Sequence, residues 1–328
     1  MIENPTEQNA TSYRRHLINV LGVFVVASLI LYLNSNRNAL ESLKNIRWQQ
    51  ITWIIVLDTT SFLIGSLQNQ SLINRFDLRV GFLDCFLLQY GNNFLNKILP
   101  TIGGGAAFRA IYLKKKYQFP YSQFVSTVAG LYVISFFSVA IIGIACLWII
   151  YIQYNQFNLI ILMAFISTLL PCLFIIIFSP QMPQGNNKFL KLLKSIIEGW
   201  NVIKQEPRNI FVYAIFSIVI LLLSALQTLI SYQALGVKTD IVSMLFLSTL
   251  GIILALLNFT PDGIGIKEGI YIFSASLVQI PGNILVLGSL VLRGISFCTT
   301  LMIGGISYWI LMRRLKTLEH RVNDVMPD

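Results

Sequence analysis

One hydrophobic stretch in the last third of the chain is interrupted in a way that restricts the possible folds. From Asn258 to Gly269 the sequence reads NFTPDGIGIKEG, with a proline, two glycines and the adjacent charges of Lys267 and Glu268 between apolar segments. In a lipid bilayer, irregular backbone and charge are tolerated only where protein or a water-filled cavity surrounds them. If the chain lies in a membrane, this interruption is a candidate functional site.

The composition indicates that the chain does lie in a membrane. Of its 328 residues, 55% are hydrophobic and 12% are charged, and the mean hydropathy is +0.69, which is too apolar for an ordinary soluble domain. The net charge of +10 comes from basic residues that cluster in tails and loops. Such clusters are typical of positive-inside topology and of contact with anionic headgroups, so we expect no nucleic-acid partner.

The apolar pattern predicts an all-α polytopic integral membrane protein, with residues 1–328 forming a single transmembrane domain. About six segments are long enough to span a bilayer: 17–33, 51–67, 124–151, 157–178, 210–233 and 284–312. Two more, 80–113 and 241–280, are broken by proline and glycine, and we expect each to enter the membrane and return as a re-entrant helical hairpin. A basic amphipathic helix at 186–208 is expected to lie in the cytoplasmic interface, and the lysine and arginine clusters predict that both termini are cytoplasmic.

The two broken segments share one spacing. Three features recur at an offset of 161 residues: Pro100 with Pro261, Gly104 with Gly265, and residues 134–149 with 295–310, where seven of sixteen positions are identical. A shared offset in prolines, glycines and an Ile-Ser-Phe run indicates an internal repeat.

The repeat unit is a span, a hairpin and a span, and it covers residues 51–151 and again residues 210–312. Because three spans separate the two hairpins, the copies should run through the membrane in opposite directions. Inverted repeats with broken helices are an architecture of secondary transporters. The alternative is that isoleucine-rich spans resemble one another and that both loops merely turn corners.

Charged side chains in or near the hydrocarbon are the candidate site residues. They are Asp58, Asp84, Lys97, Arg109, Asp262, Lys267, Glu268 and Arg293. Each would cost several kcal/mol unpaired at the bilayer centre, so we expect pairing, with Glu268 and Arg293 as the first pair. In the functional interpretation, Arg109, Lys267 and Arg293 neutralise a headgroup in a cavity organised by Glu268.

The glycine loops and the carboxylates of these segments have further possible roles. Helix N-termini after the loops of Gly104, Gly263 and Gly265 could offer backbone N–H groups to a phosphate. Asp58, Asp84 or Glu268 could couple protons to transport. The structural alternative is that the charges are ion pairs that fix the hairpins, and that the glycines serve tight bends or close helix packing.

The sequence contains few residues of the types that enzyme active sites use. The histidines, His16 and His320, lie in the tails, and the four cysteines lie in hydrophobic segments without CxxC spacing, so we expect no catalytic residue, no metal and no cofactor. No glycine triplet completes a dinucleotide fingerprint or a Walker loop.

Two motifs carry a resemblance to a known family. They are Pro100, Gly103, Gly104 and Arg109, then Pro261, Gly263, Gly265, Lys267, Glu268 and Arg293. This pairing resembles the flippase-like membrane region of lysylphosphatidylglycerol synthases and their stand-alone relatives, over nearly the whole chain. Gly105, Ala106 and Ala107 occupy a place where an acidic residue is common in the family, and Tyr132 stands opposite Arg293 in the repeat. The first half-site is therefore electrically simpler than the family pattern. The family's synthases also carry a cytoplasmic aminoacyl-transfer domain, and with only a short tail after Met312 we expect no lysyl transfer by this chain alone.

The resemblance implies a protein of the inner membrane that moves a lipid, or a lipid-linked anionic amphiphile, between leaflets. The expected partners are membrane phospholipids or a lipid-linked substrate. A second hypothesis is a membrane-embedded transferase or accessory subunit for lipid or glycan modification, whose catalytic domain a glycosyltransferase or other cell-envelope enzyme supplies. A third is a small-solute secondary carrier.

Overall fold

The computed structural model describes residues 40–76, 78–98, 104–179, 188–205, 207–254, 263 and 265–325. Within these ranges the chain is helical and contains no strand, which confirms the expected all-α class. The main helices are α3 Trp48–Ile73, α4 Phe82–Ile98, α5 Gly104–Tyr117, α6 Tyr121–Tyr154, α7 Leu159–Phe178, α8 Lys188–Lys204, α9 Pro207–Ala234, α10 Ile241–Leu254, α11 Ile266–Phe273, α12 Ala275–Val278, α13 Gly282–Thr299, the π-helical turn η5 Thr300–Gly304, and α14 Gly305–Val325. The predicted span at 17–33 and the residues Pro100, Gly103, Pro261 and Asp262 lie outside the described part of the chain.

Five helical segments in the described ranges are long and apolar enough to cross a membrane. They are Trp48–Phe76, Tyr121–Tyr154, Leu159–Phe178, Ile210–Ala234 and Gly282–Thr317. Each contains or overlaps one of the predicted spans, and the broken segments appear as the shorter helices α4 with α5 and α10 with α11 and α12. The chain is therefore a polytopic membrane protein.

Local chemistry explains where the pair α6 and α7 turns. Helix α6 ends at Asn155, which adopts a left-handed conformation with φ of 52°, a conformation that asparagine tolerates better than most residues. Helix α7 then starts at Asn158, whose side-chain oxygen accepts hydrogen bonds from the backbone N–H groups of Ile160 and Ile161 at 3.0 and 3.2 Å. These caps satisfy groups that a helix end leaves free, so the two spans are joined by a four-residue loop without charge.

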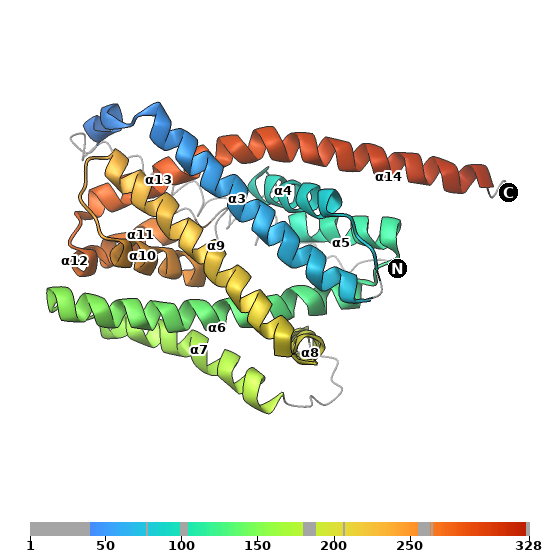
Figure 1. The fold of residues 1–328 in the computed structure, drawn as a ribbon, viewed down its shortest axis with the longest axis horizontal. Helices are drawn as coiled ribbons and strands as arrows, with labels where there is room; N and C mark the ends of the chain where they lie inside the picture. The colour runs from blue at the N-terminus through green and yellow to red at the C-terminus, as the bar shows by residue number, and fades with distance from the viewer. Residues whose placement is uncertain are drawn as a thin grey trace, which may run out of the picture.

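The helices pack in a reciprocal pattern. Helices α3 and α9 run side by side across the bundle (Figure 1), and the Gln68 side chain donates to the Tyr213 carbonyl and the Ser217 hydroxyl, each at 3.3 Å. Helix α4 packs on α14 and η5, whereas α10 packs on α6. The first helix of each hairpin thus contacts the last span of the other proposed repeat, although the inverted repeat itself stays a prediction.

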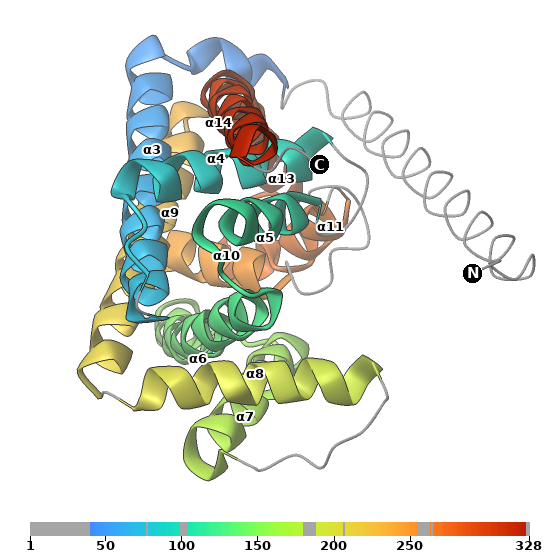
Figure 2. The ribbon, with the colours of Figure 1, turned by 90° about the vertical axis from the view of Figure 1, so that its right-hand side faces the viewer.

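Helix α8 lies across α6 at one end of the bundle (Figure 2). Its Trp200 and Ile203 are buried, and glycines allow the backbones to touch: a Cβ at Gly199 would lie 1.7 Å from the carbonyl oxygen of Ser126. The apolar face of the predicted amphipathic helix therefore packs largely on protein. Its position at the membrane surface stays a prediction.

Candidate functional site

The glycine turn before α11 sets the position of Glu268. Gly263 and Gly265 have φ values of 67° and 86°, a region that favours glycine because it has no Cβ. The backbone N–H of Gly265 donates to Oε2 of Glu268 at 2.7 Å, and Glu268 is the third residue of α11, with only 2% of its surface exposed. The negative carboxylate lies in the first turn of this helix, where the helix dipole favours it.

Glu268 and Arg293 form the ion pair that the sequence predicts. Nη1 of Arg293 lies 3.4 Å from Oε1 of Glu268, and the Ser289 hydroxyl donates to the same oxygen at 3.0 Å. Nη2 of Arg293 donates to the carbonyl oxygen of Gly263 at 3.3 Å. Arg293 thereby ties α13 to both the turn and the helix of the second hairpin, while 14% of its side chain remains exposed.

Arg293 lines a cavity of about 380 Å³ between six helices. Its walls are Asp58 of α3, Asn93 and Lys97 of α4, Ser224, Gln227 and Thr228 of α9, Ser248, Gly251 and Ile252 of α10, and Gly263, Lys267, Tyr271, Leu292, Arg293 and Ser296 of the second hairpin and α13. Three cationic side chains and one carboxylate therefore share a hollow that is otherwise lined mainly by hydroxyl and amide groups. Such walls suit an anionic, hydrogen-bonding group.

Lys267 is a cationic side chain of this cavity that has no carboxylate partner among the described residues. Its Nζ lies 5.4 Å from the centre of the Tyr271 ring, and within the described part of the chain it forms no ion pair. The Tyr271 hydroxyl donates to the Leu247 carbonyl at 3.2 Å, which fixes the ring. A Cβ at Gly251 would lie 3.2 Å from both the Lys267 Cε and the Tyr271 hydroxyl, so glycine leaves this lysine its room.

Lys97 and Asp58 come from the proposed first repeat. Nζ of Lys97 donates to the Ser296 hydroxyl at 3.0 Å, which joins α4 to α13. Oδ2 of Asp58 is buried and has no hydrogen-bond partner among the described residues. A buried carboxylate oxygen without a partner is costly. Asp58 is therefore suited to take up a proton or a cationic partner.

The first-hairpin candidates lie elsewhere. Arg109 does not line the cavity: Nη2 donates to Asn69 at 2.6 Å, and its guanidinium lies 5.6 Å from the centre of the Phe124 ring. Gly104 begins α5, and a Cβ at the next residue, Gly105, would lie 2.1 Å from the Asn92 carbonyl oxygen. The structure thus does not bring Arg109 together with Lys267 and Arg293 in this cavity, and the adjoining glycine serves close packing of α5 on α4.

Asp84 is also remote from the cavity. Its carboxylate accepts hydrogen bonds from Lys116, Tyr117 and Arg314, so it ties α4 to α5 and α14. Lys116 is therefore an ion-pair partner as well as part of the predicted basic cluster. A carboxylate held by two cations is a poor candidate for proton coupling.

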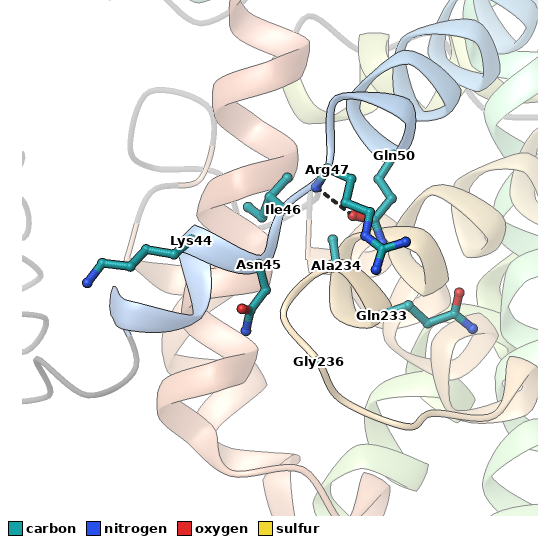
Figure 3. Close-up of a pocket in the computed structure, with 8 residues that line it drawn as sticks. All are labelled: Lys44, Asn45, Ile46, Arg47, Gln50, Gln233, Ala234 and Gly236. Carbon is teal, nitrogen blue, oxygen red and sulfur yellow. Dashed lines mark hydrogen bonds between the residues drawn. The ribbon is translucent and has the colours of Figure 1, made fainter.

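A second hollow, of about 500 Å³, lies where α3 begins and α9 ends (Figure 3). Its lining includes Lys44, Arg47 and Gln50, and the Arg47 N–H donates to the Gln50 side chain at 2.9 Å. Lys44 points away from the other labelled side chains in Figure 3. None of the predicted site residues lies here, so the charged cavity is the candidate site.

The sequence did not assign most of the cavity walls. Asn93 and Lys97 are four residues apart on α4, as are Ser224 and Thr228 on α9, and a polar stripe of that spacing on an apolar helix was the available signal. Among the described residues, no group of three or more His, Cys, Asp or Glu side chains could hold a metal ion.

Comparison with known proteins supports the resemblance seen in the motifs. A UPF0104 membrane protein, MJ1595, of Methanocaldococcus jannaschii is similar to this chain, with 22% identity over 321 residues that cover 91% of this chain and 95% of that protein. The family described as the lysylphosphatidylglycerol synthase TM region matches residues 19–304, which include both hairpins and the whole cavity. The chain therefore belongs to the family of the lysylphosphatidylglycerol synthase transmembrane region.

Proposed function

We propose that this protein moves a phosphate-bearing lipid, or a lipid-linked anionic amphiphile, between the leaflets of the inner membrane, with both termini cytoplasmic. The observation that carries the proposal is the cavity of about 380 Å³, in which Lys97, Lys267 and Arg293 meet between apolar helices. Only the headgroup of a lipid needs polar surroundings during its passage, because the hydrocarbon chains stay in the bilayer core. The family's description names a lipid synthase, which agrees with a lipid substrate.

The cavity offers a phosphate two kinds of donor. Lys267 supplies an ammonium group with no described ion-pair partner, and Arg293 supplies a guanidinium fixed by Glu268 and Gly263. Charge-assisted hydrogen bonds of this type are about twice as strong as neutral ones. The hydroxyl and amide groups of α9 and α10 can then bond to a polar substituent on the phosphate.

Asp58 is the proposed coupling residue. Of the three carboxylates expected to carry protons, Glu268 is paired with Arg293 and Asp84 lies outside the cavity. Asp58 lines the cavity together with Lys97 and has an oxygen without a described partner. Proton uptake by Asp58 would raise the positive charge of the cavity when an anionic headgroup enters. No catalytic step is assigned to the chain, and any cell-envelope enzyme that makes or uses the lipid is a proposed partner.

The test is reconstitution of the purified protein in vesicles with fluorescent phosphatidylglycerol, scored by how much label a membrane-impermeant quencher reaches. We expect translocation by the unaltered chain and a slowing of about tenfold or more in Lys267→Gln, because a hydrogen bond to a charged group contributes about 1.5–3 kcal/mol. Lys194→Gln is the matched control: it removes the same charge from the exposed side of α8.

The Asp58→Asn variant, in the same assay, distinguishes the coupling of protons to transport from the binding of lipid. We expect it to abolish the dependence of the rate on a pH gradient while lipid binding persists. Failure of the unaltered protein to move any anionic lipid, with or without a pH gradient, would overturn the proposed function. Transport of a soluble anion instead of lipid would favour a solute carrier.

A further inference from the structure

An apolar groove of about 480 Å³ lies next to the charged cavity on two of the same helices. It is lined by Ile51 and Ile55 of α3 and by Gly294, Ile295, Cys298, Thr299, Met302 and Ile303 of α13 and η5. The only hydroxyl, that of Thr299, already donates to the Ile295 carbonyl at 2.9 Å. The groove therefore offers hydrocarbon surface and almost no hydrogen bonding.

The residues that line the groove lie close in sequence to residues that line the cavity, on both α3 and α13. On α3, Ile51, Ile55 and Asp58 follow one another at spacings of four and three residues, so they lie on one face of the helix. On α13, Arg293 and Ser296 line the cavity while the residues next to each, Gly294 and Ile295, line the groove. The two spaces thus lie against the same pair of helices, α3 and α13, which are in contact with each other.

We propose that this groove holds a hydrocarbon chain of the same anionic lipid whose phosphate occupies the charged cavity, so that α3 and α13 form the lateral portal of the site. The inference rests on the proposed function and adds to it where the lipid enters and how its chain is oriented. A charged cavity alone suits a soluble anion equally well. An apolar groove beside it suits an amphiphile.

The groove selects by shape rather than by hydrophobicity. A lipid chain that leaves the bilayer core for the groove exchanges one apolar environment for another, so there is no hydrophobic driving force for the transfer. The π-helical turn η5 forms part of the wall, and such turns occur often at functional sites. Binding energy then comes from the headgroup, and the groove fixes the direction in which the chain leaves it.

Gly294 gives a direct way to fill the groove. It is exposed, and a Cβ built there meets no atom within 4 Å, so the first carbon of an added side chain has open space around it. Gly269 of α11 is the matched control, because it is also helical, exposed and free of neighbours within 4 Å, yet does not line the groove.

The experiment uses the full chain in phosphatidylcholine nanodiscs that contain phosphatidylglycerol with a photoactivatable diazirine in one chain. Peptide mapping should place the cross-links at Ile51, Ile55 and Met302, and unlabelled phosphatidylglycerol should compete for them. We expect Gly294→Trp to lower this labelling about tenfold, which corresponds to about 1.4 kcal/mol, and Gly269→Trp to leave it unchanged. Thermal unfolding of both variants checks their folding.

A second experiment fills the groove chemically in the unaltered, already folded protein. Cys298 lines the groove and is exposed, whereas Cys85, Cys146 and Cys172 are buried. Alkylation of Cys298 in the folded protein with N-ethylmaleimide should lower the same labelling, and Cys298→Ser should be insensitive to the reagent.

Three outcomes would overturn the inference: undiminished labelling after both the tryptophan change and alkylation, equal labelling by diazirine phosphatidylcholine, or lipid cross-links at residues 17–33 in place of the groove residues. If lipid is translocated but the groove is not labelled, the portal is wrong and the proposed function stands. If the groove is labelled but no lipid is translocated, the proposed function fails and the chain-binding groove stands.

Discussion

Glu268 is held by three neighbours, one in the glycine turn before α11 and two on α13. The Gly265 N–H, the Ser289 hydroxyl and the Arg293 guanidinium all contact its carboxylate. Taking such a pair out of water is expensive, and the hydrogen bonds are what make the burial tolerable. The charge of Glu268 therefore supports Arg293 in its position at the cavity wall.

Glu268→Gln should accordingly destabilise the protein by about 3 kcal/mol, because it leaves the Arg293 charge without its counter-charge. The double change Glu268→Gln with Arg293→Met should recover most of that loss, since no uncompensated charge remains. Thermal unfolding in detergent measures both. Lipid transport should be lost in both variants, and unchanged transport in folded Glu268→Gln would assign the pair a purely structural role.

At the scale of elements, the contact between α6 and α8 depends on glycine. A Cβ on Gly199 would lie 1.7 Å from the Ser126 carbonyl oxygen, and backbone has little freedom to move away. We expect Gly199→Ala to cost about 3 kcal/mol through overpacking. Gly269→Ala should do the opposite and stabilise by about 0.5–1 kcal/mol, because its helical site is open and alanine loses less backbone entropy. Equal effects of the two changes on the unfolding midpoint would contradict this packing.

Asp240 caps the N-terminus of α10. Its carboxylate accepts hydrogen bonds from the Ser243 N–H at 2.9 Å, the Ser243 hydroxyl at 2.6 Å and the Tyr154 hydroxyl at 3.1 Å. Partial burial acts to raise the pKa of Asp240, but the hydrogen bonds from Ser243 and Tyr154 outweigh it and hold that pKa below its usual value. The charged cap thus contributes stability above the unfolded pKa of about 3.9, and this contribution is lost as the pH falls through the lower folded pKa.

Asp240→Ala should therefore cost about 1 kcal/mol near pH 7. The difference from the unaltered chain should shrink as the pH falls below about 4, because protonation removes the charged cap from the unaltered chain as well. Unfolding midpoints from pH 3 to 7 give the measurement. A difference that grows on acidification would show that the carboxylate is not the stabilising form.

The sequence predicted the membrane spans and the ion pair of Glu268 with Arg293, whereas it did not predict which residues line the cavity. Apolar length predicts spans directly, and two opposite charges flanking one hairpin have few other partners. Lys97 and Ser296 are 199 residues apart, and their contact depends on how α4 packs against α13. The separation of Arg109 from this cavity was not predictable either, because its sequence position does not tell that its side chain contacts Asn69 and Phe124.

At the scale of the whole molecule, the sidedness of the bundle can be measured. The proposed topology puts Lys115 on the cytoplasmic side and Gln156, in the loop between α6 and α7, on the other, and both residues are exposed. In a Cys298→Ser background, an impermeant maleimide should label Gln156→Cys in intact cells and Lys115→Cys only after permeabilisation. Labelling of both from the same side would exclude the proposed topology and, with it, the inverted orientation of the repeats.

The lengths of α6 and α7 determine the depth at which α8 lies. At about 1.5 Å per residue, the 20 residues of α7 measure about 30 Å, the thickness of a bilayer core, whereas the 34 residues of α6 measure about 51 Å. Because the short loop aligns one pair of ends, we expect roughly the first two fifths of α6, with Ser126 and Gly130, to extend past the hydrocarbon. Helix α8 binds there, and Trp200 contacts Ser179 at the end of α7 through a hydrogen bond of 3.1 Å. We therefore expect the helix between the two halves of the chain to lie at the level of the lipid headgroups, where the excess length of its neighbour holds it.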